Sequence, residues 1–269
     1  MSEPGSPVCT PDWLALREPA DHAARSEDLA AGLDTWLGAD PADLVVRDLG
    51  CGTGSMGRWL APRLTRRQRW LLHDRDADLA HRAAASPPPG PDAATAVVGD
   101  LSDLTDVEGT DLVVCSALLD LLRAADVGHL AGLCAAAGAA ALLTLSVTGE
   151  VVLDPPDPLD DAVTTAFDAH QRRDGRLGPD AAGAAAAAFG RRGYAVVWRA
   201  SPWRLGPGDA ALAEEWLRGR VDAACAQDPS LVPHAGRYLA DRCEALAVGT
   251  LHAEVGHADL LALPPGRSR

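Results

Sequence analysis

Residues 44–57 have the sequence LVVRDLGCGTGSMG, and this stretch decides the fold. Its first part, Leu44–Leu49, is a short and largely apolar run of the kind that forms a buried strand. Glycines follow directly, and residues Met56–Leu64 have the pattern of a helix. Glycine suits such a turn because it lets a ligand approach the backbone closely, and the first turn of a helix offers unpaired N–H groups. This order of strand, glycine turn and helix predicts a loop that binds an organic cofactor.

The glycines alone allow two interpretations of that loop. Residues Gly52–Gly57 fit the G-x-G-x-x-G pattern of dinucleotide-binding proteins, and Asp74 lies about twenty residues further on, where such proteins place a ribose-binding acid. On this interpretation the chain is an NAD(P)-dependent oxidoreductase. However, Asp48 and Gly50 precede the pattern and extend it to DLGCGTG. These two residues favour a different cofactor.

Strand and helix patterns alternate on both sides of the loop. Further strands are predicted at residues 70–73, 94–98, 111–115 and 139–146, and further helices at 77–85, 117–123 and 129–137. Helical patterns also cover residues 12–37, with a break near Pro19. Continuous apolar strands that alternate with helices predict a parallel sheet covered on both faces.

The second half of the chain is less regular. It is predicted to contain a loop rich in Pro and Asp at 151–161, helices at 164–170, 181–190, 209–225 and 236–249, and strands at 194–198 and 257–263. We expect the side chain of Asp180 to cap the Ala-rich helix that follows it.

The composition is that of a globular protein, with 47% hydrophobic residues in a chain of 269. A net charge of −14 disfavours nucleic acids, whose binders usually present basic surfaces. The six cysteines include no Cys-x-x-Cys pair and are expected as reduced thiols. The sequence shows no secretory signal pattern, and every apolar run is too short to span a bilayer. We therefore expect a cytoplasmic protein with a small-molecule substrate and no nucleic-acid or membrane partner, and its oligomeric state stays open.

Residues 45–54 resemble motif I of the class I methyltransferases that use S-adenosylmethionine (SAM). Three further blocks recur in the order of that family: residues 72–76 (LHDRD), 98–101 (VGDL) and 111–116 (DLVVCS). The resemblance implies a Rossmann-like α/β fold with a seven-stranded, mostly parallel sheet, an antiparallel C-terminal strand and helices on both faces. It also implies extra helices at the N-terminus and between the sixth and seventh strands.

The same resemblance implies one methyltransferase domain over residues 12–264, flanked by tails at 1–11 and 265–269. Its expected parts are an N-terminal helical lid at 12–40, a SAM-binding core at 44–146 and an excursion on the substrate side at 147–256.

By this resemblance, the ends of the first four strands hold the cofactor. Asp48 would hold the ammonium group of its methionine part, directly or through water. Asp74 would accept hydrogen bonds from both ribose hydroxyls, and a charge-assisted bond of this type contributes about 1.5–3 kcal/mol. The remaining cofactor residues would be Gly50, Cys51, Gly52, Gly54, Arg75, Asp100, Leu101, Cys115 and Ser116. Asp74 has a second interpretation, as the N-cap of helix 77–85.

Methyl transfer from SAM needs an aligned nucleophile and, where that nucleophile must lose a proton, a general base. Asp120 is the first candidate for this base and His170 the second. Their simpler interpretations are a solvent-facing acid and a surface histidine. Trp13 and Arg17 are candidates for a lid over the cofactor, although Trp13 also fits a place in the core. Arg172 is a candidate for binding an acidic group of the substrate.

Further blocks at residues 16–21, 116–121, 170–172 and 177–180 are similar to a bacterial subfamily of small-molecule methyltransferases of unknown substrate. The leading hypothesis is SAM-dependent methyl transfer to an O or N atom of a small metabolite, such as a heterocyclic or natural-product intermediate. Two alternatives stay open: the oxidoreductase above, and a non-catalytic SAM-fold partner protein with helices 209–249 as its interface. The histidines at 234, 252 and 257 show no metal-binding spacing, so no metal is expected.

Overall fold

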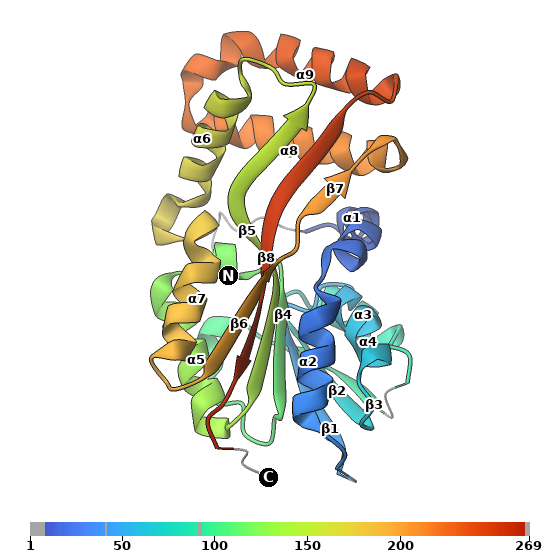
Figure 1. The fold of residues 1–269 in the computed structure, drawn as a ribbon, viewed down its shortest axis with the longest axis vertical. Helices are drawn as coiled ribbons and strands as arrows, with labels where there is room; N and C mark the ends of the chain where they lie inside the picture. The colour runs from blue at the N-terminus through green and yellow to red at the C-terminus, as the bar shows by residue number, and fades with distance from the viewer. Residues whose placement is uncertain (1–8, 41, 91–92, 267–269) are drawn as a thin grey trace.

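The computed structural model describes residues 9–40, 42–90 and 93–266, which form a mixed sheet with helices on both faces (Figure 1). The strands are β1 (Leu44–Leu49), β2 (Gln68–Asp74), β3 (Ala93–Val98), β4 (Leu112–Ser116), β5 (Ala140–Asp154), β6 (Ala195–Ala200), β7 (Trp203–Leu205) and β8 (His252–Leu263). Their order across the sheet is β3-β2-β1-β4-β5-β8-β6, and β7 pairs with the first part of β8. The predicted seven strands are present, and the three-residue strand β7 is an addition that the sequence did not signal.

Strands β1 to β5 run parallel, as the alternating pattern predicted. Val46 on β1 lies opposite Trp70 on β2 and Leu112 on β4, and all three side chains are fully buried. β8 is antiparallel to both of its neighbours, β5 and β6. This arrangement confirms the predicted Rossmann-like fold with an antiparallel C-terminal strand.

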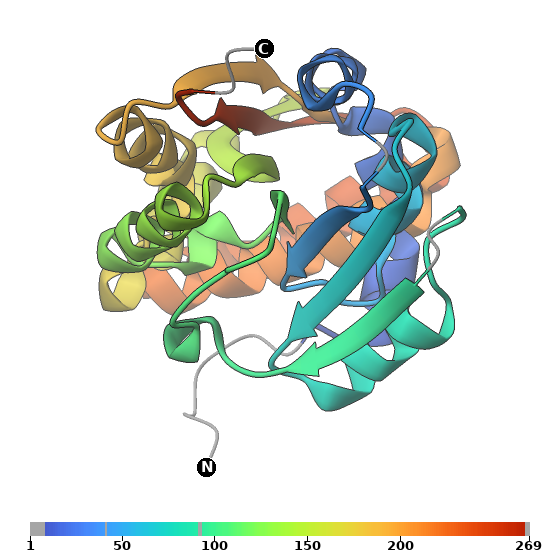
Figure 2. The same cartoon turned by 90° about the horizontal axis from the view of Figure 1, so that it is seen from below.

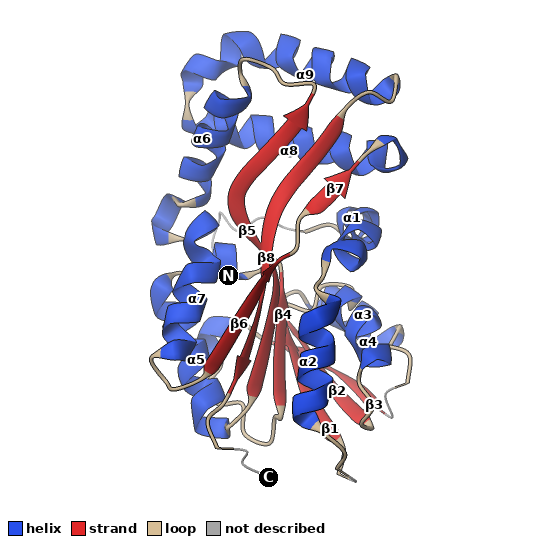
Figure 3. Cartoon of the chain, in the orientation of Figure 1, coloured by secondary structure: helices blue, strands red, loops and turns tan. Residues whose placement is uncertain are grey.

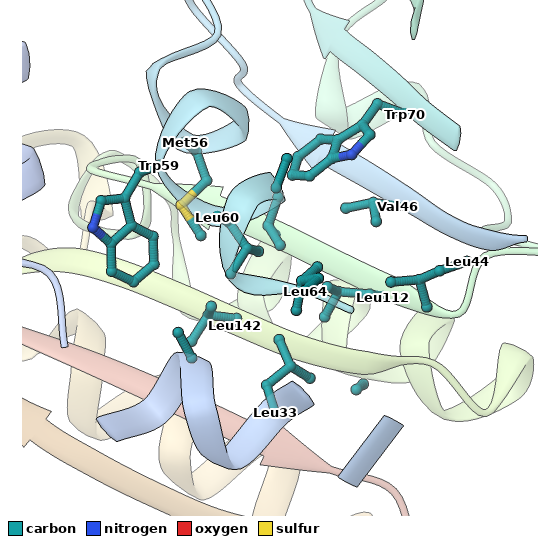
Figure 4. Close-up of a cluster of buried hydrophobic side chains, with 14 of the residues drawn as sticks. Leu33, Leu44, Val46, Met56, Trp59, Leu60, Leu64, Trp70, Leu112 and Leu142 are labelled. Carbon is teal, nitrogen blue, oxygen red and sulfur yellow. The ribbon is translucent and has the colours of Figure 1, made fainter. Parts of the chain in front are cut away.

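Helices cover the two faces of the sheet and bury a separate core on each (Figure 2). One layer contains α2 (Glu27–Leu37), α3 (Ser55–Leu60) and α4 (Ala77–Ala85), and the other contains α5 (Ala124–Ala137) and α7 (Ala181–Gly190). Figure 4 shows how Leu33 of α2 and Trp59 of α3 approach Leu142 of β5 in the first core. In the second core, Phe189 of α7 packs edge-on against Tyr194 at 5.1 Å between ring centroids.

The first helix, α1 (Pro11–Ala24), contains Pro19. The predicted break near Pro19 was wrong, because the helix continues to Ala24 and the break follows at Arg25. A proline inside a helix removes one hydrogen bond to the carbonyl four residues earlier. Here that carbonyl belongs to Ala15, and both residues are exposed, so water can replace the lost bond. Ser26 then caps α2 by accepting the N–H of Leu29.

Strands β5 and β8 are unusually long, with 15 and 12 residues, and they extend beyond the parallel sheet (Figure 3). Residues 147–154 and 252–257, here called the arms, pair with each other past two register shifts. The predicted loop at 151–161 is therefore strand as far as Asp154, and the last strand begins at His252 rather than 257. In the arms, Ala253 and Val255 are buried while Glu254 between them is exposed. This alternation is typical of a strand with one face exposed to solvent.

Three helices surround the arms: α6 (Asp160–Gln171), α8 (Ala210–Gln227) and α9 (Val232–Ala247). They confirm the predicted helices in these regions with shifted ends. Asp180 lies at the N-cap position of α7, but its side chain makes no cap hydrogen bond and pairs with Arg172 instead. None of the helices in the described part of the chain is both long and apolar enough to cross a membrane. Of the two predicted tails, residues 1–8 and 267–269 lie outside the described residues, and α1 already begins at Pro11.

Candidate functional site

The glycine loop connects β1 to α3 at the carboxyl end of the parallel strands. Gly50, Gly52 and Gly54 have φ values of +69, +53 and +89, in the left-handed region that favours glycine. A Cβ atom on Gly50 would lie 2.8 Å from the Leu118 side chain, and one on Gly52 would lie 3.1 Å from Leu14. The loop is thus packed between α1 and the segment that follows β4.

The end of β2 holds the backbone of this loop. The N–H groups of Gly50 and Cys51 donate to the carbonyl of His73 over 2.8 and 3.0 Å. The N–H of Gly52 donates to Oδ2 of Asp74 over 2.9 Å. Asp74 therefore lies at the glycine loop, where the resemblance places the ribose acid.

Helix α4 is capped by Asp76 and not by Asp74. Asp76 accepts the N–H groups of Asp78 and Leu79, while Oδ1 of Asp74 accepts the N–H of Asp76. The second interpretation of Asp74, as the N-cap of this helix, was therefore wrong. Arg75, between the two acids, is exposed.

The side chain of Asp48 lies beneath the loop with no exposed surface. Neither of its carboxylate oxygens has a hydrogen-bond partner among the described residues. Burial raises the pKa of this carboxyl to about 7, although nearby Arg25 acts in the opposite direction. An orphaned buried carboxylate at this position fits the ammonium group of a SAM molecule, because burying a charge is costly unless it is paired.

Arg25 is a buried residue that the sequence reasoning missed. It is 3% exposed, and its guanidinium donates to Ser116 Oγ over 3.0 Å and to Ser55 Oγ over 3.3 Å. Burial lowers its pKa, and the carboxylates of Asp21, Asp259 and Asp48 oppose that effect. The only sequence signal was its place directly before the cap of α2, which the expected break at Pro19 obscured.

The other predicted cofactor residues lie at the ends of β3 and β4. Asp100 caps the short 3-10 helix 101–103 by accepting the N–H of Ser102, and this bond lowers the pKa of its carboxyl. Leu101 is partly buried in the second core. Cys115 is buried, and burial raises the pKa of its thiol. The structure thus brings the predicted cofactor residues to one edge of the sheet, and their individual roles stay predictions.

Helix α1 is fastened directly over the glycine loop. Glu18 forms a bidentate pair with Arg58 of α3, with distances of 2.7 and 2.6 Å. Arg58 also donates to the carbonyl of Thr53 in the loop. Cys9 lies just before α1, and burial raises the pKa of its thiol. The nearby charge of Arg17 lowers this pKa, and that of Asp74 raises it. The N-terminal segment is therefore bonded beside the glycine loop, and its role as a lid stays a prediction.

A cavity of about 160 Å³ lies next to this lid, between α1, α6, α8, the arms and the segment after β4. Residues from all of these elements line it: Trp13, Arg17, Ala117, Asp120, Leu145, Val147, Gly149, Glu150, Val151, Phe167, Asp168, Gln171, Trp203, Trp216, Arg220, Val255, Gly256 and His257. Ala117 and Asp120 follow Ser116 at the end of β4, so one short segment borders both the glycine loop and the cavity.

Asp120 and His257 are two buried titratable side chains of the cavity wall, at 8% and 4% exposed. Burial raises the pKa of the Asp120 carboxyl, against the opposing charges of Arg17 and Arg176. Burial also lowers the pKa of His257 to about 4, so its ring is neutral at pH 7. The simpler interpretation of Asp120 as a solvent-facing acid was wrong. The sequence indicated only that His257 lacks metal-binding spacing, and its place in the cavity wall was missed.

Arg17 and Trp13 both face the cavity from α1. The guanidinium of Arg17 binds both oxygens of Asp21 at 3.0 and 3.2 Å and stacks 4.9 Å from the centre of the Trp203 ring. Trp203 in turn donates its indole N–H to Asp21. This network fixes the side of the lid that faces the cavity.

The structure does not bring His170 or Arg172 into the cavity wall. His170 lies on α6, whose residues Phe167, Asp168 and Gln171 are the ones that line the cavity. Arg172 is exposed and paired with the Asp180 carboxylate at 2.8 and 3.2 Å. Its guanidinium is therefore already engaged away from the cavity.

Residues 46–137 match a family model described as a methyltransferase domain. No curated protein matches the chain. Among solved structures, the chain is similar to the cyclopropane synthase MmaA2 of Mycobacterium tuberculosis, with 14% identity, 94% of each chain covered and a TM-score of 0.50. It is also similar to a putative methyltransferase of Bacillus halodurans, with 14% identity, 89% and 100% of the two chains covered and a TM-score of 0.51.

The sheet also distinguishes the two interpretations of the glycine pattern. Dinucleotide-binding domains have the all-parallel strand order 3-2-1-4-5-6. Here the antiparallel strand β8 lies between β5 and β6. The fold and the domain match both favour the SAM interpretation of the loop.

Proposed function

We propose that this chain, which carries a class I SAM-dependent methyltransferase domain, transfers the methyl group of SAM to an O or N atom of a small molecule held in the cavity. The observation that carries the proposal is the position of Asp120. It lies a few residues beyond the end of β4, is almost fully buried, and faces the cavity beside the predicted cofactor site.

The ends of β1 and α1 suit the amino-acid end of the cofactor. An α-amino acid carries an ammonium and a carboxylate on one carbon. The orphaned carboxylate of Asp48 would accept the ammonium, and the buried guanidinium of Arg25 would bind the carboxylate. Asp74, already fixed by Gly52, would receive the ribose hydroxyls.

When bound, SAM supplies an electrophilic methyl group, and the chain supplies alignment and a proton acceptor. Holding the reacting atoms in line contributes about 7–11 kcal/mol toward lowering the barrier. The substrate atom would use its lone pair to accept the methyl group, and the sulfur of SAM would keep the electron pair of the bond that the methyl group leaves. We assign the proton released by the substrate N–H or O–H to the carboxylate of Asp120, whose raised pKa makes it a better base than an exposed acid.

Labelled methyl transfer tests this function. The full chain is incubated with SAM that carries a labelled methyl group and with a cell extract. The extract is then separated into its small-molecule, protein and RNA fractions. We expect label in the small-molecule fraction, and a loss of about 10²–10⁴-fold in rate for Asp120→Asn. SAM binding by calorimetry should be unchanged in that variant. Label confined to protein or RNA, or a wild-type chain that does not bind SAM, would overturn the proposal.

A further inference from the structure

The cavity collects a large share of the aromatic side chains of the protein. The chain has only seven Trp, two Phe and two Tyr, yet Trp13, Phe167, Trp203 and Trp216 all line this one space. They come from α1, α6, β7 and α8, elements far apart in the sequence. Flat apolar walls brought together in this way favour a planar ring, because aromatic faces stack.

The two arginines of the cavity are already engaged in the wall. Arg17 is neutralised by the bidentate contact with Asp21. Arg220 stacks 4.8 Å from the centre of the Phe167 ring and 5.4 Å from that of Trp216, and donates to Thr164 over 2.8 Å. Both guanidinium groups therefore form part of the aromatic wall.

The carboxylates that line the cavity, those of Asp120, Glu150 and Asp168, lack a side-chain donor among the described residues. No side chain among the described residues donates a hydrogen bond to the carboxylate of Asp120, which is 8% exposed, or to that of Asp168 on α6, although the charge of nearby Arg220 acts on Asp168. Burial raises the pKa of both carboxyls. Asp120 is nine-tenths buried and Asp168 is partly buried, and carboxylates that face a cavity without a side-chain donor indicate a ligand that brings its own donors.

The opposite strand is shaped to accept the Asp168 carboxylate. Gly149 in the arm of β5 has φ +80, and a Cβ atom there would lie 2.5 Å from Oδ2 of Asp168. Only glycine allows both this backbone conformation and this close approach. The glycine in the arm therefore leaves space for the Asp168 carboxylate at the cavity wall.

From this geometry we infer that the methyl acceptor is a planar nitrogen heterocycle with N–H donors on its edge, of the amidine or guanidine type, and that Asp168 selects it. The inference rests on the proposed function for the role of this ligand as substrate. The ring stacks among the tryptophans, and adjacent N–H groups meet the two oxygens of Asp168 in the parallel geometry that carboxylates and guanidinium groups share.

Binding of two fragments tests this inference without any methyl transfer. The probes are 2-aminobenzimidazole, which has N–H donors around an N–C–N edge, and benzothiazole, a bicycle of similar shape with no N–H. Titration calorimetry on the full chain should give at least tenfold tighter binding of 2-aminobenzimidazole. Asp168→Asn should remove that preference. Asp161→Asn, an exposed acid on the same helix, should keep it.

A second measurement locates the probe. The indole N–H signals of Trp13 and Trp216, assigned through Trp→Phe variants, should shift on addition of 2-aminobenzimidazole, while that of exposed Trp198 stays in place. Equal affinity for the two probes, an unchanged preference in Asp168→Asn, or shifts at Trp198 alone would overturn the inference and leave the labelled-methyl result intact. Conversely, selective probe binding in a chain that transfers no methyl group would support the inference as a binding property and overturn only the proposed function.

Discussion

The carboxylate of Asp48 and the guanidinium of Arg25 lie close together in the interior, at 0% and 3% exposed. Arg25 is bonded to two serine hydroxyls, whereas the Asp48 oxygens have no partner among the described residues. A carboxylate left in this state destabilises the fold, and its pKa rises as a result. Locally unfavourable arrangements of this kind are expected where a residue serves a ligand rather than the fold.

This burial predicts a pH dependence of stability that Asp48→Asn should remove. The pKa of Asp48 is about 7 in the folded chain and about 3.9 for an unperturbed aspartate. At pH values between these two pKa values, the Asp48 carboxyl binds a proton in the folded chain that it has lost in the unfolded chain. The free energy of unfolding should therefore fall as the pH rises from about 4 to about 7, by at most about 4 kcal/mol. Urea unfolding of both chains at several pH values measures this slope, and parallel curves would contradict it.

Asp74 and Asp76 form a matched pair of acids for a binding prediction. Asp74→Ala removes the carboxylate bonded to the Gly52 N–H and should weaken SAM binding by about tenfold or more. Asp76→Ala removes the cap of α4 and should reduce stability by about 1 kcal/mol while leaving SAM affinity nearly unchanged. Calorimetry with SAM and thermal unfolding separate the two effects. If the affinity loss followed Asp76 instead, Asp74 would not belong to the cofactor site.

Helices and strands that have a local sequence pattern were predictable from the sequence. Those that form only through contacts with distant segments of the chain were not. The glycine loop and the Ala-rich helix α7 carry local signals and lie where expected. Strand β7 has three residues, and it forms because Trp203 and Leu205 bury themselves against the arms and α8. The upper part of β5 was read as a loop because Pro and Asp follow it closely, although β8 pairs with it up to Asp154.

The pair between Glu18 and Arg58 predicts how the lid is held. Glu18→Gln should weaken the contact of α1 with α3 and the glycine loop, so SAM should dissociate several times faster. Glu27→Gln is the control, because it breaks a similar bidentate pair with Arg63 that is more exposed. Stopped-flow displacement of bound SAM measures both rates. Equal rates in the two variants would mean that α1 does not hold the cofactor in place.

The cavity is a property of the whole molecule, which explains why sequence reasoning found only part of it. Trp13, Arg17 and Asp120 were singled out from their neighbourhood in the chain. Asp168 and His257 gave no local signal, because they become part of a site only when α6 and the arm of β8 meet the lid. His170 and Arg172 belong to the same helix region as Asp168 but lie outside the cavity wall. A shift of a few residues along α6 thus decides whether a side chain lies in the cavity wall.

Asp259 connects these distant parts, and its removal should affect the whole fold. Its buried carboxylate accepts the N–H of Ser26 between α1 and α2, the N–H of Leu145 in β5, and the hydroxyl of Ser201 before β7, over 2.8, 2.8 and 2.6 Å. Leu145 has φ +56, a strained value that the bond to Asp259 helps to hold in place.

Asp259→Ala leaves three donors without an acceptor, those of Leu145 and Ser201 buried and that of Ser26 partly buried. Each orphaned buried donor costs about 1–3 kcal/mol. We expect a loss of at least about 3 kcal/mol in the free energy of unfolding, measured by urea denaturation. Asp28→Ala is the control, because that acid is exposed and its ion pair with Arg199 is long at 3.9 Å. This substitution should change stability by less than about 1 kcal/mol. Because Leu145 also lines the cavity, Asp259→Asn, which keeps one acceptor oxygen, should fold but bind 2-aminobenzimidazole more weakly. A stable Asp259→Ala chain with unchanged probe binding would show that the lid, β5 and β7 do not depend on this residue.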